Sequence, residues 1–278
     1  MSAFLFAAHL AAIGGLMSGK RGRIERAHNA LILKAIAKGG LSFVVQPIHD
    51  AKNIEEILYA ECLARVTDAE GIVHTAGAFV PQLEQLVGRF DLDFRMLDMI
   101  LAASTAEPAL TLGCNLSAAT LSAPDRFADI FNRISQQPEL ASRLVVEITE
   151  TYPPVGAAIE RLKMIRALGC RIAIDDFGTG FATPAHMLQV SADIIKIDAA
   201  FVRDIRPGHN GGDSLYHLVG FASCLASMVI VEGIETETQL EAARASGATH
   251  VQGFLLSKPV TLQQLPQTKG KFGLREVG

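Results

Sequence analysis

Short apolar runs rich in Val and Ile alternate along most of the chain with longer segments whose apolar residues recur at helical spacing. The runs predict eight strands, at residues 42–46, 57–65, 110–115, 143–149, 171–175, 194–198, 228–232 and 249–252. Eight strands alternating with helices favour a parallel sheet covered by helices, and eight is the number that closes a (β/α)₈ barrel. An open doubly wound sheet stays an alternative, although no G-x-G-x-x-G follows the first strand.

The helical segments carry start and stop signals. Residues 24–38 have helical composition and end at Gly39-Gly40. In "VGAAIERLKMIRALGC" the apolar positions fall on one helical face and Gly169 supplies the stop, as Gly247 does for "ETQLEAARASG". "LYHLVGFASCLAS" reads as a helix too, and Asp213 before it as an N-cap rather than a ligand site. These signals divide the chain into an N-terminal helical and apolar segment (1–39), a barrel (40–265) and a C-terminal tail (266–278).

The N-terminal segment contains "AFLFAAHLAAIGGLM", an apolar run at residues 3–17. It is shorter than the roughly 20 residues that span a membrane. Its basic flank follows the run, which is the reverse of a signal peptide. We favour a packed helix or an oligomer contact, and keep as an alternative the remnant of a membrane anchor with the basic flank inside the cell.

Composition narrows the class of protein. Apolar residues make up 49% of the chain and charged residues 19%, which is typical of a globular protein with a sizeable core. The formal charge of -4 provides no basic footprint for duplex nucleic acid. The four cysteines lie far apart and form no C-x-x-C pair, which favours reduced thiols in a cytoplasmic protein.

The most informative pattern is where polar side chains fall. Strand after strand runs apolar and then ends on a residue that binds metal or moves protons: Asn115, Glu147, Asp175, Asp176, Lys196, Asp198, Glu232 and Gln252. To these the early strand adds Glu61 and Arg65. Each has a simple explanation when taken alone, such as a cap or a surface ion pair. Buried charges are costly unless paired or ligated, so their accumulation at equivalent strand ends indicates one shared site. In barrels that site is the C-terminal face.

The chemistry of this set is specific. The Asn, Glu and Asp side chains of this set all offer oxygen as the metal ligand, and the set contains no His or Cys. Such ligands suit Mg²⁺ or Mn²⁺ and argue against zinc. Adjacent Asp175 and Asp176 can serve two ions, which together activate water for phosphoryl transfer. Lys196 and Glu232 are candidates to orient and deprotonate that water, and Arg65 to hold a phosphate. The residues therefore predict a metal-dependent phosphodiesterase or hydrolase on a barrel.

These residues resemble the EAL-domain cyclic di-GMP phosphodiesterases. The resemblance runs from about Phe43 to Pro259 and shows, in family order, as "QPI", "ECLAR" in place of E-A-L-x-R, "NLS", "EITE", "DDFGTG", "KID", "EGIET" and "QGFLLSKP". It implies a modified TIM barrel whose first strand is antiparallel to the rest. It also implies hydrolysis of cyclic di-GMP to linear pGpG with two Mg²⁺ or Mn²⁺ ions per site, inhibition by Ca²⁺, and a homodimer.

The resemblance also implies roles by position. Glu61, Asn115, Glu147 and Asp175 would bind the first ion, and Asp175 would bridge to a second ion held also by Asp176 and Glu232. Lys196 would contact the attacking water. The remaining implied roles are completion of the inner shell by Asp198 and Gln252, substrate contacts by Gln46 and Arg65, and a hold by Glu235 on the loop after Asp176.

Two departures from the family pattern stand out. Cys62 replaces the Ala of the name-giving motif while Glu61 is retained, so we expect little effect. "FATPAHM" replaces the usual F/Y-S-S-L stretch, and Pro184 removes a backbone donor there, which predicts altered regulation or dimer coupling.

The alternative to an active enzyme is a catalytically weak EAL domain that acts as a cyclic di-GMP receptor or a protein-interaction module. Degenerate members lose the carboxylates or the lysine, and this chain keeps them.

Overall fold

The computed structural model describes residues 20–84, 90–149, 156–179, 188–209 and 211–265. It contains two compact units, one formed by Met1–Val44 and Leu63–Met96 and the other by Val45–Cys62 and Leu97–Gly278. The predicted N-terminal apolar run, the C-terminal tail and the departure at residues 181–187 lie outside the described residues. The predicted boundaries after residues 39 and 265 stay predictions.

All eight predicted strands are present. They are β1 (Leu41–Asp50), β2 (Ile57–Thr67), β4 (Leu112–Asn115), β5 (Leu144–Thr149), β6 (Arg171–Phe177), β7 (Ile194–Ile197), β8 (Met228–Val231) and β9 (His250–Val251). A further strand, β3 (Val73–Thr75), was not predicted because three residues carry too little periodicity. It pairs antiparallel with the end of β2, in the register Arg65↔Thr75.

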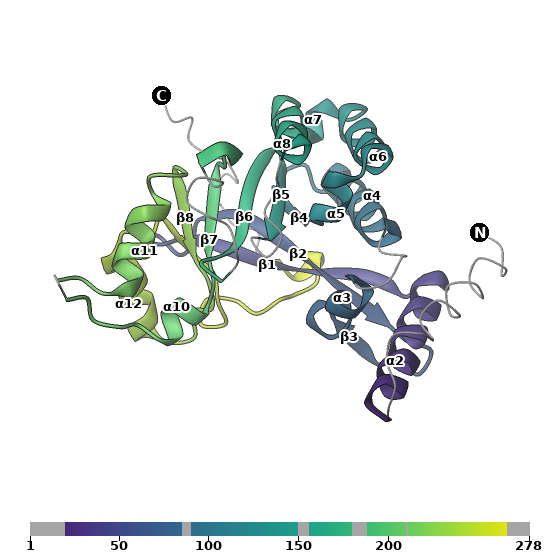
Figure 1. Cartoon of the computed structure of the whole chain (residues 1–278), viewed down its shortest axis with the longest axis horizontal. Coiled ribbons are helices and arrows are strands. Elements are labelled where there is room, and N and C mark those ends of the chain that lie inside the picture. The colour runs from purple at the N-terminus through teal and green to yellow at the C-terminus, as the bar shows by residue number, and fades with distance from the viewer. Residues whose placement is uncertain (1–19, 85–89, 150–155, 180–187, 210, 266–278) are drawn as a thin grey trace. The chain divides into compact units, whose positions relative to one another are not determined.

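The strands form a closed barrel of the modified TIM type (Figure 1). Neighbours pair in the order β1-β9-β8-β7-β6-β5-β4-β2, and β1 also pairs with β2. The pairings from β2 to β9 are parallel, whereas β1 runs antiparallel to β9 with His49 opposite Val251. Residues 51–56 alone join β1 to β2, which is too short for the crossover that a parallel pair requires.

Helices follow the barrel strands in the second unit. Those that lie wholly in this unit are α5 (Ala118–Ser122), α6 (Pro124–Ser135), α7 (Pro138–Ala141), α8 (Ala157–Ala167), α10 (Ala200–Arg203), α11 (Ser214–Ala222) and α12 (Glu237–Ser246), and a short 3₁₀ turn, η2, covers Leu262–Gln264. The predicted caps are confirmed, since Asp213 accepts the N–H of Tyr216 and Gly247 has a φ of 89°. Thr236 caps α12, because its hydroxyl accepts the N–H of Gln239.

The first unit holds α2 (Lys20–Ala37), α3 (Ala76–Glu84) and β3, and α4 (Phe90–Ala106) begins in its part of the chain. The predicted stop after α2 is confirmed, with Gly39 at a φ of 86°. The turn between β2 and β3 is organised by buried Asp68, which accepts the N–H of Ile72 and contacts Nε2 of His74 at 2.8 Å. Within the described ranges no helix has the length and apolar character to span a membrane. The membrane anchor considered above would involve residues 3–17, which lie outside those ranges.

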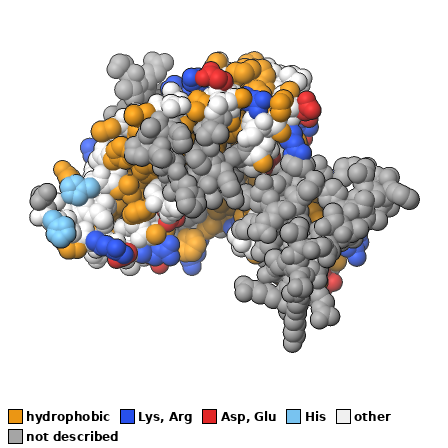
Figure 2. Space-filling model, viewed as in Figure 1, with side chains coloured by type: hydrophobic (Ala, Val, Ile, Leu, Met, Phe, Trp, Pro, Cys, Tyr) orange, Lys and Arg blue, Asp and Glu red, His pale blue; other side chains and the backbone are white. Residues whose placement is uncertain are grey.

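Charged side chains of both signs occur on the face drawn in Figure 2. On the face drawn in Figure 2, Lys and Arg alternate with Asp, Glu and apolar side chains, and no continuous basic stripe crosses the part of that face that is described. This distribution fits the small net negative charge of the chain.

Candidate active site

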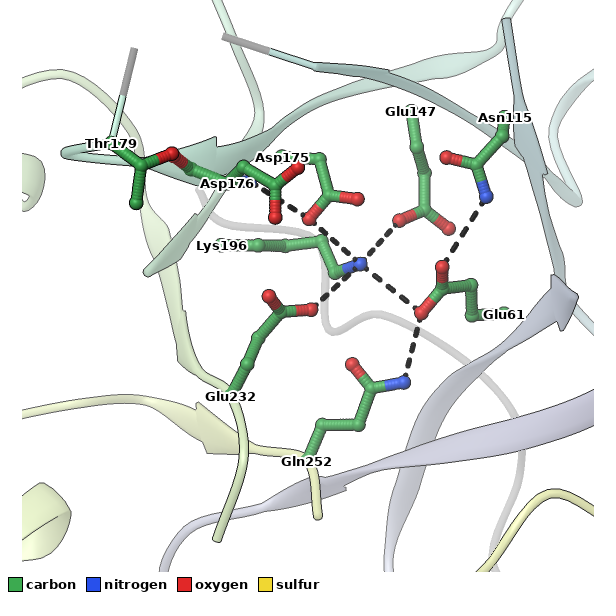
Figure 3. A network of polar contacts seen from close by, with 9 residues as sticks. All are labelled: Glu61, Asn115, Glu147, Asp175, Asp176, Thr179, Lys196, Glu232 and Gln252. Atoms are coloured by element: carbon green, nitrogen blue, oxygen red, sulfur yellow. Dashed lines mark hydrogen bonds and ion pairs between the residues drawn. The ribbon is translucent and has the colours of Figure 1, made fainter. Parts of the chain in front are cut away.

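Inward-facing side chains of the barrel form an apolar layer with a polar layer above it. The apolar layer is a buried cluster of Ile48, Leu58, Tyr59, Val145, Ala173, Ile194 and Ile230. Five of these residues lie two positions before a polar residue of the same strand or, for Glu232, directly after it, and side chains two apart in a strand face the same way. The polar partners are Glu61, Glu147, Asp175, Lys196 and Glu232, which point toward one another in Figure 3.

Lys196 is the centre of the polar layer. Its side chain is fully buried, and four carboxylates from four other strands or strand ends surround its ammonium group (Figure 3). The distances from Nζ are 2.7 Å to Glu147, 2.9 Å to Glu232, 3.0 Å to Asp175 and 3.2 Å to Glu61. Four carboxylates and one ammonium leave a formal surplus of three negative charges.

Among the described residues, Glu61 is the carboxylate of this group whose two oxygens both accept hydrogen bonds. One of its oxygens accepts the amide of Asn115 at 3.3 Å. The other accepts the amide of Gln252 at 2.9 Å and faces Lys196. The structure therefore places Asn115 and Gln252 where they orient Glu61, from β4 and from the residue after β9.

The backbone turns at Asp176, so the two adjacent aspartates reach the same site. Asp176 has a φ of 56°, in the left-handed region that non-glycine residues rarely adopt. Its N–H donates to the Asp175 carboxylate at 3.0 Å, and its carbonyl accepts from the hydroxyl of Thr179. Gly178, at a φ of 98°, continues this turn in a conformation that glycine favours. The strain at Asp176 keeps both carboxylates at the same site.

The charge state of Lys196 follows from its neighbours. Burial on its own would lower the pKa of this ammonium group. The surrounding negative charges outweigh burial and raise the pKa well above its usual value, with contributions from Asp175, Glu147, Glu232 and Glu61. Lys196 is therefore protonated at neutral pH, so it donates hydrogen bonds and cannot accept a proton from water.

The carboxyl groups respond in two ways. Burial, with repulsion from neighbouring carboxylates, raises the pKa of Glu147 to about 8 and that of Asp176 to about 6, and raises the pKa of Asp175 and Glu232. Burial also opposes ionisation of Glu61, yet Lys196 and the amides of Gln252 and Asn115 hold its pKa below the usual value. Glu61 is therefore the carboxylate that the protein itself keeps charged.

The donor set fits divalent cations. Two groups of carboxylates have oxygens within 4.8 Å of one another: Glu61, Glu147 and Asp175 in one, Asp175, Asp176 and Glu232 in the other. Oε1 of Glu147 and Oε1 of Gln252 are buried without a hydrogen-bond partner among the described residues. Nζ of Lys196 lies at ion-pair distance from the other Glu147 oxygen but outside hydrogen-bonding geometry. Unpaired buried oxygens and surplus negative charge are what a hard cation such as Mg²⁺ or Mn²⁺ satisfies.

These pKa shifts predict that stabilisation by metal grows with pH. Without ions, the folded state holds protons on Glu147 up to about pH 8 and on Asp176 up to about pH 6, whereas the unfolded chain releases them near pH 4. The folded state thus binds more protons in that window, and its stability falls as pH rises. A divalent cation replaces these protons, so the increase in Tm on adding Mn²⁺ should be larger at pH 8 than at pH 6.

Thermal unfolding with EDTA and with Mn²⁺ at both pH values measures this difference. NaCl at matched ionic strength is the control for general screening. An increase in Tm that is equal at the two pH values would show that the ions do not displace these protons.

Gly113 provides the room for Glu147. It lies on β4 at an inward position, two residues before Asn115. A Cβ at this position would lie 2.1 Å from Oε1 of Glu147 and 2.8 Å from Cε2 of Tyr59. No real side chain tolerates such distances, so only glycine leaves the Glu147 carboxylate beside Lys196.

We expect Gly113→Ala to destabilise the metal-free protein by about 1–3 kcal/mol and to weaken Mn²⁺ binding, because Glu147 must move. Urea unfolding and a Mn²⁺ titration measure the two effects. Gly220→Ala is the matched control, since Gly220 lies in α11 and its added Cβ meets nothing within 4 Å. That variant should be slightly more stable than the wild type. Equal stability of the two variants would contradict the packing described for Gly113.

A pocket of about 200 Å³ opens onto the polar layer. Its lining includes Gln46, Glu61, Glu232, Glu235, Gln252 and Phe254. A larger hollow of about 550 Å³ lies in the first unit, beside the end of α2 and the turn after β2. That hollow contains no group of carboxylates arranged as a metal site among the described residues. The smaller pocket is the candidate active site because it reaches the carboxylates.

The other predicted site residues lie in different places in the structure. Gln46 lines the pocket, and Glu235 lines it with an exposed side chain. Asp198 belongs to neither carboxylate group; it accepts the N–H of Ala200 at 2.8 Å and adds to the repulsion that raises the pKa of Asp176. Arg65 belongs to the first unit, where its guanidinium donates to the carbonyl of Ala64 at 2.9 Å. Roles for Asp198 as a ligand and Arg65 as a substrate contact stay predictions.

Two residues of the site were not predicted. Gly113 and Tyr59 shape the space around Glu147, and the Tyr59 hydroxyl is buried without a partner in the described structure. The sequence contains a signal for both, because Tyr59 lies two positions before Glu61 and Gly113 two positions before Asn115, so each faces the same way as a site residue. An inward glycine in such a strand indicates a close approach.

Comparisons with known proteins show which family the chain resembles. The family model described as EAL domain matches residues 29–259. The chain is 31% identical, over 83% of its length, to the probable cyclic di-GMP phosphodiesterase PdeA of Escherichia coli, of which it spans 32%. It thus covers about a third of the length of that relative.

Solved structures match the fold. An EAL domain protein from Listeria monocytogenes has a TM-score of 0.74 at 21% identity, covering 86% of this chain and 96% of that one. The MucR phosphodiesterase of Pseudomonas aeruginosa, solved as a cyclic di-GMP complex, has a TM-score of 0.70 at 26% identity, covering 86% and 99%. With a family model that matches most of its length, the chain belongs to the EAL domain family.

Proposed function

We propose that this chain is a phosphodiesterase that hydrolyses cyclic di-GMP to linear pGpG with two divalent cations, Mg²⁺ or Mn²⁺. The observation that carries the proposal is the pair of carboxylate groups that share Asp175 around a buried, protonated Lys196. Relatives named cyclic di-GMP phosphodiesterases support the substrate.

The pocket alone would repel the substrate. Its lining carries Glu61, Glu232 and Glu235, and no Lys or Arg among the described residues. A phosphodiester is anionic, so it needs cations between itself and these carboxylates. When bound, the two ions would neutralise the diester and lower the pKa of water at the site. Glu61, Asn115, Glu147 and Asp175 would hold one ion, and Asp175, Asp176 and Glu232 the other, with Asp198 a further candidate.

The chain's own residues would divide the remaining work. Lys196 carries its proton, so its part is to orient the attacking water and stabilise negative charge on the diester. Glu232 lines the pocket and contacts Lys196, which supports it as the group that would accept the proton of that water. Water adds across one P–O3′ bond, which leaves a 5′-phosphate on the linear product and a free 3′-hydroxyl.

Gln46 and Gln252 supply amides beside the carboxylates, Gln252 by orienting Glu61 and Gln46 by facing the substrate. Further parts of the proposal are a substrate contact by Arg65, inhibition by Ca²⁺, a homodimer, and a hold by Glu235 on the loop after Asp176. That loop lies at residues 180–187, outside the described residues.

The decisive experiment is incubation of the full chain with cyclic di-GMP and either Mg²⁺ or Mn²⁺, followed by chromatographic separation of the products. We expect pGpG in both reactions and none with EDTA. Binding of cyclic di-GMP without pGpG, under every metal condition, would assign the chain to the receptors of the family instead. The absence of both binding and turnover would overturn the proposal.

A further inference from the structure

Gln46 is held in one orientation at the edge of the pocket. Its Nε2 donates to the carbonyl oxygen of Ser257 at 3.2 Å. A carbonyl only accepts, so the NH₂ group of the amide must face Ser257 and the oxygen must face away. Among the described residues Oε1 of Gln46 has no hydrogen-bond partner, and it is not one of the fully buried unpaired atoms, so it keeps some exposure. Gln46 itself lines the pocket.

The hydroxyl of Ser257 is held by a histidine that the catalytic site does not use. His49 lies three residues after Gln46 on β1 and is buried. Its Nδ1 lies 2.7 Å from the carbonyl oxygen of Ile54, which fixes the proton on Nδ1. Burial lowers the pKa of His49, despite the bond to Ile54, so the ring is neutral at neutral pH. Nε2 therefore accepts the Ser257 hydroxyl, 3.1 Å away.

Ser257 closes a turn that forms one wall of the pocket. Its N–H donates to the carbonyl of Gly253 at 3.0 Å, and Gly253 and Phe254 line the pocket. Backbone bonds at 2.8 Å and 2.9 Å between Val45 and Val260 anchor the chain beyond the turn. Loss of the His49 contact would thus free the Ser257 side chain and loosen the turn locally, while the Val45–Val260 bonds keep the barrel closed.

We propose that His49 is a positioning residue that acts through Ser257 to keep the Gln46 amide oxygen facing the bound ligand. This inference rests on the proposed function for the identity of the ligand. An amide oxygen accepts hydrogen bonds and repels phosphate oxygens, so Gln46 meets an N–H or O–H group of the nucleotide, on the base or the ribose, and not its phosphate.

The first test is a mutational cycle on cyclic di-GMP affinity, measured with Ca²⁺ in place of Mg²⁺ to slow turnover. We expect His49→Leu to raise Kd about five- to ten-fold, the scale of one lost hydrogen bond, and to leave kcat at saturation near wild type. His49→Gln, whose amide oxygen can take the place of Nε2, should restore most of the affinity. In a Gln46→Leu background, His49→Leu should add nothing further.

The second test needs no ligand. The side-chain amide protons of Gln46, followed by NMR in ¹⁵N-labelled protein, should exchange faster with water in His49→Leu and in Ser257→Ala than in the wild type. A wild type that does not bind cyclic di-GMP would defeat the proposed function, while the exchange rates would still decide the role of His49. Unchanged exchange, or effects of His49 and Gln46 on Kd that multiply, would overturn the inference.

Discussion

Lys196→Met should lower kcat by about 10³-fold while leaving Mn²⁺ affinity undiminished. The substitution removes the ammonium group that contacts four carboxylates and keeps a side chain of similar length. Turnover falls because the attacking water loses its donor and the diester loses a fixed positive charge. Metal binding is maintained, since removing a cation from a surplus of carboxylates makes the site more attractive to ions.

Steady-state kinetics and a Mn²⁺ titration on the same sample measure the two quantities. Lys163→Met is the matched control, because Lys163 forms only an exposed ion pair with Glu160 and should be silent in both. In metal-free protein we expect Lys196→Met to be destabilised, and metal to restore its Tm. Wild-type turnover in Lys196→Met would remove the lysine from the mechanism.

Glu61→Ala should abolish measurable turnover and weaken Mn²⁺ binding by at least about 100-fold. Glu61 is the one carboxylate of the cluster whose pKa is held below its usual value, so it is charged before any ion arrives. Its loss also leaves the amides of Asn115 and Gln252 without their acceptor. The fold should persist, because removing one negative charge reduces the repulsion in the polar layer.

Isothermal titration with Mn²⁺ gives the affinity, and circular dichroism checks the fold. Glu55→Ala, at an exposed position on the connection between β1 and β2, is the control and should bind Mn²⁺ like the wild type. The contrast with Lys196→Met is the sharper result: one variant loses metal and activity together, the other only activity. An active Glu61→Ala variant would mean that the metal site lies elsewhere.

Much of the fold followed from the sequence because barrel strands are buried and strongly apolar. All eight strands were predicted, and the polar residue two positions after an apolar one identifies the layer to which each belongs. Glu61 after Tyr59 and Lys196 after Ile194 follow this rule. The reversal of β1 was expected from the family resemblance, and the short connection at residues 51–56 explains it physically.

Other features depend on distances that no single strand contains. Gly113 matters because a carboxylate from β5 enters the space beside it. The contact between His49 and Ser257 joins residues 208 positions apart, and neither carries a motif that indicates the other. Asp198 shows the converse, since a carboxylate at the expected strand end accepts the backbone N–H of Ala200 instead. The contacts of Gly113 and His49 are set by the packing of segments that are distant in the sequence, so the sequence pattern alone does not indicate them.

The buried ammonium of Lys196 has a consequence for how the protein exchanges its ions. A tethered cation cannot diffuse away, so when divalent ions leave, one positive charge still holds four carboxylates of the barrel together. Structural zinc domains lack such a substitute and unfold when stripped. Here demetallation should be a reversible equilibrium of the folded chain, and the tethered charge, by competing for the same oxygens, limits how tightly the ions are retained. Occupancy would then follow the free metal concentration around the protein.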